Sequence, residues 1–182
     1  APQVPAPAAS APYAAARRQA LSDRFPGEWL VIPTGNLKVR ANDTDYPFRP
    51  GTDFYWLTGS MEPDAVLVFE PTAAGHETTL YLAPRMDRST KAFFADRRYG
   101  ELWVGPRLGL ESEQLLGIPC APLDELDGAL KRIEGAPVRV LRGHDARVDG
   151  LLAPRDHDDA SGVHPDAELA TALSEQRLVK DA

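Results

Sequence analysis

The chain has 182 residues, 43% of them hydrophobic and 26% charged, which is typical of a single globular domain with its own packed core. The formal net charge of −7 argues against a nucleic-acid partner, because binding phosphate requires a positive surface. No apolar run approaches the roughly 20 residues that span a bilayer, so no membrane partner is expected.

Residues 1–12 are rich in Pro and Ala, which predicts an extended, disordered leader. They lack the basic start and the continuous apolar centre of a secretory signal. Residues 13–25 are rich in good helix formers and predict a helix that Pro26-Gly27 ends. EWLVIP then predicts a buried strand, and LKVR, after a Thr-Gly-Asn turn, predicts an edge or half-buried strand.

The stretch YPFRPGTDFYWLTG, residues 46–59, is dense in aromatic side chains. Its first part, YPFRPG, predicts an ordered loop in which Pro47 and Pro50 limit the backbone freedom lost on folding. Its second part, TDFYWLTG, predicts a core strand whose alternate residues face opposite sides.

The consecutive apolar residues of AVLVF predict a central strand buried on both faces, and TTLYLAP predicts its hairpin partner. The next predicted elements are a short helix that bears Phe93 and Phe94 and is capped by Asp87 or Ser89, and then a brief strand or ordered loop at ELWVG. A helical turn closed by Gly117 and a strand at IPCAP follow. The last predicted elements are a helix at LDELDGALKRIEG, a strand at VRVL and a helix that starts at Pro165. This mixture predicts an α/β domain with a mixed sheet flanked by helices.

Acidic and imidazole side chains gather in a polar segment that follows residue 152. They are Asp156, His157, Asp158, Asp159, His164 and Asp166. Their spacing matches no calcium loop, so a solvated linker is favoured over a metal site. His144-Asp145 is interpreted as a turn after a strand rather than a catalytic pair, because adjacent residues rarely face one another.

The sequence contains no Gly-rich phosphate loop, no GxSxG motif and no HExxH motif. Cys120, the single cysteine, excludes an internal disulfide, and its apolar neighbours favour a buried, inert thiol over a nucleophile. A lone thiol also fits a reducing compartment, so a cytoplasmic location is expected. Motifs alone therefore indicate a folded module with no catalytic and no metal-binding residue of its own.

Two short segments leave alternatives open. In ELWVGPRLG, Trp103 among glycines is more often a core residue, and the alternative is a ring that faces a ligand on a rigid loop. In RANDTDYPFR, Asp43 and Asp45 lie between Arg40 and Arg49. Local ion pairing is the simpler interpretation there, and contact with another subunit is the alternative.

The segment RANDTDYPFRPGTDFYWLTGSMEPDAVLVFEP resembles the N-terminal domain of aminopeptidase P, in the creatinase/prolidase ("pita-bread") metallopeptidase family. ELWVGPRLG resembles the later Trp-x-Gly-x-Arg-x-Gly segment of that family, and the likeness runs in order from about Tyr13 over most of the chain. The matching elements of the first segment are Asp43, Tyr46 to Arg49, Asp53 to Tyr55, Leu57 to Gly59 and Glu62 to Val68.

The resemblance implies a creatinase/prolidase N-terminal fold over residues 13–152, after the leader 1–12. Residues 153–182 are then a linker and a helix leading to a catalytic domain, and the helix lacks a stop signal, which suggests a sequence cut short. In relatives, that domain holds two divalent metal ions, usually manganese, on two Asp, one His and two Glu. None of these residues is carried over to this chain.

The implied function is the non-catalytic domain of an enzyme that removes the N-terminal residue preceding proline. Trp103 and Arg107 are implied to line the substrate cleft, and Asp43, with Tyr46 and Arg49, to contact another subunit. The implied partners are the protein's own catalytic domain, further copies in a dimer or tetramer, and proline-containing peptides. A stand-alone assembly or binding module and the N-terminal domain of a prolidase remain the alternatives.

Overall fold

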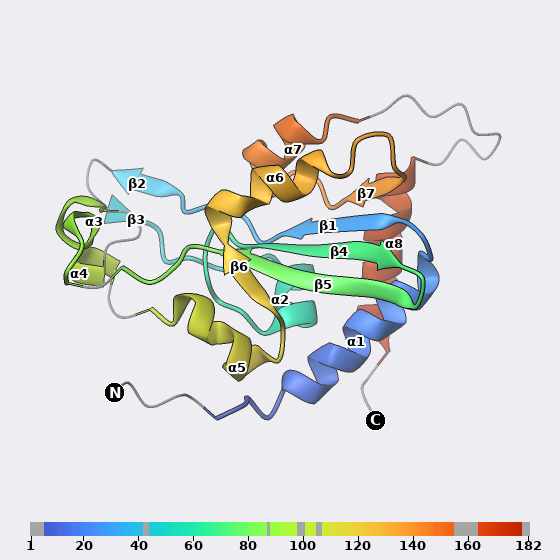
Figure 1. The fold of residues 1–182 in the computed structure, drawn as a ribbon, viewed down its shortest axis with the longest axis horizontal. Coiled ribbons are helices and arrows are strands. Elements are labelled where there is room, and N and C mark those ends of the chain that lie inside the picture. Colours follow the sequence, from blue (N-terminus) through green and yellow to red (C-terminus); the bar gives the residue numbers. More distant parts are fainter. Residues whose placement is uncertain are drawn as a thin grey trace.

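The chain builds one mixed sheet of five strands (Figure 1), and its computed structural model describes residues 6–41, 44–86, 88–97, 101–104, 107–154 and 164–179. Antiparallel pairs join β1 to β4 and β4 to β5, whereas β7 and β6 add in parallel to β1 and β5. The strand order is β6-β5-β4-β1-β7. The strands are β1 (Trp29–Pro33), β4 (Val66–Thr72), β5 (Gly75–Leu82), β6 (Cys120–Pro122) and β7 (Val138–Val140).

A second, two-stranded sheet of β2 (Val39–Ala41) and β3 (Thr44–Asp45) lies at one end of the molecule. The helices are α1 (Ala11–Arg24), α2 (Thr52–Thr58), α3 (Lys91–Ala95), α4 (Glu101–Val104), α5 (Ser112–Leu116), α6 (Leu126–Lys131), α7 (Ala146–Leu151) and α8 (Pro165–Leu178). Two 3-10 turns, η1 (Gly109–Glu111) and η2 (Leu123–Glu125), precede α5 and α6.

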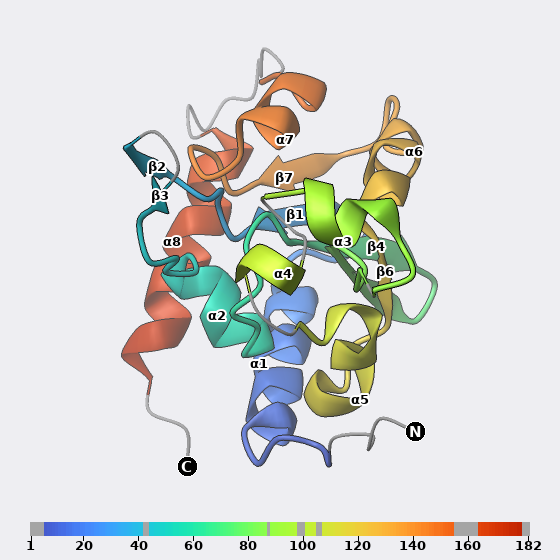
Figure 2. The same cartoon turned by 90° about the vertical axis from the view of Figure 1, so that its left-hand side faces the viewer.

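Helices cover both faces of the main sheet, and Figure 2 shows α1, α2 and α8 on one side with α6 and α7 beyond the other. The side chains of β1 divide between the faces, since Leu30 and Ile32 join the cluster under α1, α2 and α8 while Val31 joins the one under α6. This is the alternation that a strand buried on both faces requires. The prediction of a mixed sheet flanked by helices is therefore confirmed.

The prediction of a strand at TDFYWLTG is wrong, because residues 52–58 form helix α2. Phe54, Leu57 and Thr58 are buried while Tyr55 is exposed, a spacing of three and four that belongs to a helix. Gly59 ends the helix in the left-handed conformation at φ 72°, which glycine adopts without a Cβ clash.

Helices α4 and α7 also differ from expectation. ELWVG provides the four-residue helix α4 rather than a strand or loop. At the start of α3 the Thr90 hydroxyl accepts a hydrogen bond from the backbone N–H of Phe93, and Asp87, one of the two predicted caps, lies outside the described residues. Helix α7 was not predicted, and Asp145 caps it by accepting hydrogen bonds from the backbone N–H groups of residues 147 and 148.

Described residues on both sides of the expected domain limits contact the folded domain. Helix α1 begins at Ala11, and the N–H of Ala8 donates to Leu115 O at 2.9 Å, so residues from the expected leader contact the folded domain. Leu169 and Leu173 of α8 are fully buried in the core. The second half of the predicted 153–182 segment therefore packs as part of the domain, whereas Asp156 to Asp159 lie outside the described residues.

None of the helices in the described ranges has the length and apolar character needed to cross a bilayer.

Candidate functional site

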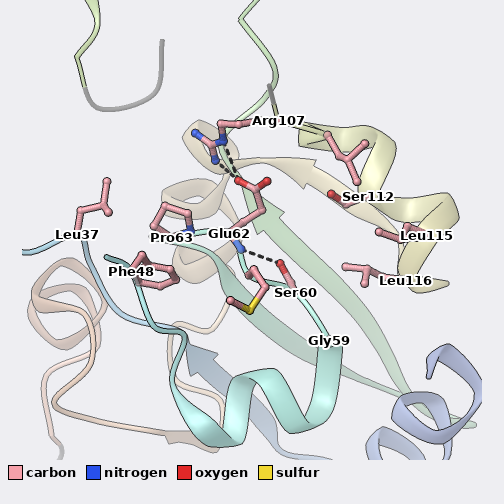
Figure 3. Close-up of a pocket in the computed structure, with 12 residues that line it drawn as sticks. Leu37, Phe48, Gly59, Ser60, Glu62, Pro63, Arg107, Ser112, Leu115 and Leu116 are labelled. Carbon is pink, nitrogen blue, oxygen red and sulfur yellow. Dashed lines mark hydrogen bonds and ion pairs between the residues drawn. The ribbon is translucent and has the colours of Figure 1, made fainter. Parts of the chain in front are cut away.

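A pocket of about 380 Å³ lies between the turn that follows α2 and helix α5 (Figure 3). Apolar side chains form two of its sides, with a charged pair and two serine hydroxyls among them. The lining residues are Leu37, Phe48, Gly59, Ser60, Met61, Glu62, Pro63, Arg107, Leu108, Ser112, Leu115 and Leu116. Half of them belong to the family-like segments YPFR, LTG, EPD and GPRLG, namely Phe48, Gly59, Glu62, Pro63, Arg107 and Leu108.

The turn after α2 is fixed by a series of hydroxyl hydrogen bonds. The Thr58 hydroxyl donates to Phe54 O at 2.8 Å and accepts from Ser60 N at 3.0 Å. The Ser60 hydroxyl in turn accepts from Glu62 N at 3.2 Å. Side-chain hydroxyls of this kind replace backbone partners in tight turns, so the position of the Glu62 backbone is well determined.

Glu62 and Arg107 form an ion pair at the pocket (Figure 3). Arg107 Nε donates to Glu62 Oε2 at 2.8 Å, and Nη2 donates to the same oxygen. The Arg107 side chain is only 8% exposed and that of Glu62 only 17%. Charges this far from water are retained when they are paired, and removing one partner leaves the other uncompensated. The pair therefore joins the start of β4 to the segment that follows α4.

A second set of polar contacts holds the residue before β4. Asp64 has a positive φ of 60°, which is costly for a residue with a side chain. Its N–H donates to Gly35 O at 2.9 Å, and its carboxylate accepts from Asn36 Nδ2 at 2.6 Å. The same amide nitrogen lies 3.1 Å from Asp145 Oδ2. These bonds stabilise the strained conformation and connect the pocket wall to the cap of α7.

The sequence-predicted site residues lie in different places. Arg107 lines the pocket, and Trp103 belongs to α4, with its side chain outside the described part. Tyr46 and Arg49 are exposed on the loop before α2, and the Arg40 guanidinium lies 5.8 Å from the Tyr46 ring centre. Asp43 is not among the described residues. The cleft and subunit-contact roles of all five stay predictions.

Sequence reasoning did not identify Glu62 as a site residue, although EPD was recognised as family-like. Its partner Arg107 is 45 positions away in the chain, and nothing in either segment specifies the other. The hydroxyls of Thr58 and Ser60 upstream of Glu62 are the local signal of an ordered turn. The pairing itself depends on the tertiary fold.

The pocket is a largely apolar cavity with an ion pair and two hydroxyl groups in its wall. Its described lining contains no His, Cys or Asp side chain. Within the ranges that the structure describes, no three His, Cys, Asp or Glu side chains are grouped so as to hold a metal ion. The arrangement is suited to binding and positioning.

Comparison with known proteins identifies relatives over nearly the whole chain. Xaa-Pro aminopeptidase 1 of Streptomyces coelicolor is 51% identical over 176 residues, 96% of this chain and 34% of the relative. Xaa-Pro aminopeptidase of Escherichia coli is 32% identical over 96 residues, 52% of this chain and 22% of the relative. The chain thus spans about a third of the length of the Streptomyces relative.

Solved structures share the fold. Aminopeptidase P from E. coli with the inhibitor Pro-Leu superimposes with a TM-score of 0.65 at 27% identity, covering 79% of this chain and 32% of that one. Proline aminopeptidase P II from Yersinia pestis gives a TM-score of 0.61 at 26% identity, covering 76% and 30%. The family model for the aminopeptidase P N-terminal domain matches residues 14–140. Because that match covers well over half of the sequence, the chain belongs to the aminopeptidase P N-terminal domain family.

Proposed function

We propose that this chain is the N-terminal, non-catalytic domain of a Xaa-Pro aminopeptidase, a hydrolase that removes the N-terminal residue preceding proline. The observation that carries the proposal is the 51% identity to a Xaa-Pro aminopeptidase over 96% of the chain, which corresponds to only 34% of that relative. The pocket is consistent with a role in shaping a binding site, because its lining combines apolar side chains with an ion pair.

The proposed contribution of the domain is to shape the substrate cleft and to help assemble an oligomer. Trp103 and Arg107 are assigned to the cleft, and Asp43, Tyr46 and Arg49 to contact with another subunit. The exposed ring of Tyr46 supports a subunit contact, since aromatic residues are enriched in protein interfaces. The partners are the catalytic part of the same protein, further copies of it, and proline-containing peptides. A cytoplasmic location is proposed from the lone thiol.

Two divalent metal ions, with manganese as the expected metal, are assigned to the catalytic part, where they would activate water for hydrolysis. No residue of this chain is assigned to them. A prolidase is the alternative of the same family, and a stand-alone module is the alternative without catalysis. The names of the relatives favour an aminopeptidase over a prolidase.

The test compares the complete reading frame that contains these 182 residues with the 182-residue chain alone. Each is assayed with manganese on a peptide that has proline second, on the same peptide with alanine second, and on a Xaa-Pro dipeptide. We expect the complete protein to cleave the longer proline peptide and the short chain to cleave none. Turnover by the short chain would refute a non-catalytic domain. Activity restricted to the dipeptide would identify a prolidase, and a reading frame that ends here would identify a stand-alone module.

A further inference from the structure

Helices α3 and α4 lie at the end of the molecule that also carries the small β2–β3 sheet (Figures 1 and 2). Neither hydrophobic cluster of the core contains a described side chain from α3 or α4. Phe94 and Leu102 are more than half exposed, at 53% and 54%. The two α4 side chains that the structure describes, Glu101 and Leu102, therefore lie outside both clusters.

An ion pair fixes the first residue of α4. Arg85, three residues after β5, places Nε 2.8 Å from Oε1 of Glu101. The Glu101 side chain is 8% exposed, and the Arg85 guanidinium also lies within 3.9 Å of Glu111 Oε2. An acidic residue in the first turn of a helix is favourable by itself, and here it also ties the helix to the chain leaving the sheet.

The second ion pair lies beyond the other end of α4. Arg107 follows the last residue of the helix by three positions, and its pair with Glu62 is the more deeply buried of the two. Because Glu62 is held by the turn after α2, this contact anchors the chain leaving α4 to the body of the domain. Two nitrogens of Arg107 share one carboxylate oxygen of Glu62, a geometry that the planar guanidinium of arginine provides and the lysine ammonium does not.

The chain entering α3 and the chain leaving α4 meet at Gly109. A Cβ placed on Gly109 would lie 2.5 Å from the backbone N of Arg85, and its φ of +54° is also one that glycine favours. The backbones of Arg85 and Gly109 are thus in direct contact. The α3–α4 segment, the part of the chain between Arg85 and Arg107, is closed at its base by this contact and held by one ion pair on each side of α4.

We propose that Glu62 and Arg107 are positioning residues that hold α4, and with it Trp103, at the substrate cleft. The inference rests on the proposed function, because the cleft role of Trp103 belongs to it. Arg107 then acts by positioning α4 rather than by binding substrate directly, because its Nε and Nη2 atoms already donate to Glu62. Activity should then depend on the Glu62–Arg107 pair through the placement of Trp103.

The test uses the complete protein and the variants Arg107→Ala and Glu62→Gln. Misplacing a substrate-contacting group by about 1 Å can cost on the order of 100-fold in rate, so we expect kcat/KM on a peptide with proline second to fall 10- to 100-fold. The initial rate of tryptic cleavage after the exposed Lys91 and Arg97 should rise in both variants, because local opening of the segment admits the protease. Arg132→Ala, which removes an exposed pair with Glu70, is the matched control and should leave both quantities unchanged.

Three further variants separate positioning from general stability. In a Trp103→Ala background, Arg107→Ala should have little additional effect on kcat/KM, because the two changes remove the same contribution. Arg107→Lys should be intermediate, and the exchange Glu62→Arg with Arg107→Glu should restore part of the lost activity. Full additivity of Trp103→Ala and Arg107→Ala, or unchanged kcat/KM in Arg107→Ala and Glu62→Gln, would overturn the inference. A wild-type protein inactive on the peptide would refute the proposed function instead, and the tryptic rates would still show whether the pair holds α4.

Discussion

At the scale of single residues, Cys120 at the start of β6 illustrates how local surroundings control reactivity. Burial, followed by the nearby Glu113 carboxylate, raises the pKa of the thiol to about 12. The thiol donates to Ile118 O at 3.3 Å, and Cys120 N donates to Glu113 Oε2 at 2.9 Å. The side chain is half-buried rather than fully buried, so the expectation of a buried thiol is only partly right. The raised pKa nevertheless supports the expectation that it is inert, because only the thiolate is a strong nucleophile.

We expect Cys120 in the native protein to react with iodoacetamide at pH 8 at least about 100-fold more slowly than in the urea-unfolded chain, because the reactive thiolate is scarce. Glu113→Gln should raise the native rate by removing the repulsion of the thiolate. The raised pKa also adds stability below pH 9 that is lost as the pH rises toward 12. Equal rates in native and unfolded protein at pH 8 would contradict the expectation.

Arg107 shows what sequence can and cannot establish about one residue. The Trp-x-Gly-x-Arg-x-Gly pattern is enough to select it, together with Trp103, for the cleft. The same pattern does not identify Glu62, whose carboxylate accepts a hydrogen bond from the Arg107 guanidinium in the folded protein. Glu62 is 45 residues away in the chain, and the tertiary fold brings the two side chains together. The ion pair of Arg107 could therefore be known only from the structure.

At the scale of elements, α8 is bound to the domain by both apolar and ionic contacts. Leu169, Ala172 and Leu173 are buried in the core. Asp166 accepts from Val140 N at 2.8 Å and pairs with Arg142, which fixes the first turn of the helix against β7. These contacts make the helix a structural part of the domain, whichever sequence follows it.

We expect Leu173→Ala to lower the free energy of unfolding by about 2–5 kcal/mol, because it removes buried methyl groups and leaves a cavity. Leu178→Ala is the matched control, since Leu178 lies on the same helix and is 84% exposed. Its effect should stay within about 0.5 kcal/mol. Urea unfolding of the two variants measures both values. If Leu173→Ala were as mild as Leu178→Ala, α8 would not be part of the cooperative core.

The elements that sequence predicts best are those whose own residues determine them. Consecutive apolar residues identify β1 and β4, and Gly117 and Pro165 identify the end of α5 and the start of α8. These segments needed no information from the rest of the chain.

The segment Thr52–Thr58 was misassigned for a physical reason. Over seven residues rich in aromatic side chains, the periods of a strand and of a helix cannot be separated. What selects the helix is contact with α1. The Arg17 guanidinium stacks over the Trp56 ring at 3.5 Å, and the buried Arg18 donates to Leu57 O at 2.8 Å. Helix α7 is shorter still, with six residues, and the roles of its cap Asp145 and its buried Val148 are evident only in the folded structure.

At the scale of the whole molecule, the main sheet lies between two hydrophobic clusters, and its strands contribute side chains to both of them. Leu30 and Leu67 point into the cluster that includes α8, whereas their neighbours Val31 and Val66 point into the cluster that includes α6. Neither cluster can lose its packing without disturbing strands that the other one also needs. The sheet should therefore make the two faces unfold together.

We expect urea unfolding of the 182-residue chain to be a single transition, because the strands of the main sheet contribute side chains to both clusters. Leu173→Ala on one face and Ile133→Ala on the other should each shift the same transition to lower urea with an unchanged slope, because both side chains are buried. Leu173 and Ile133 belong to different hydrophobic clusters, on opposite faces of the sheet. The double variant should therefore lose the sum of the two single effects to within about 0.5 kcal/mol. Two separable transitions, with each substitution shifting only one of them, would show instead that the helices on opposite faces of the sheet unfold independently.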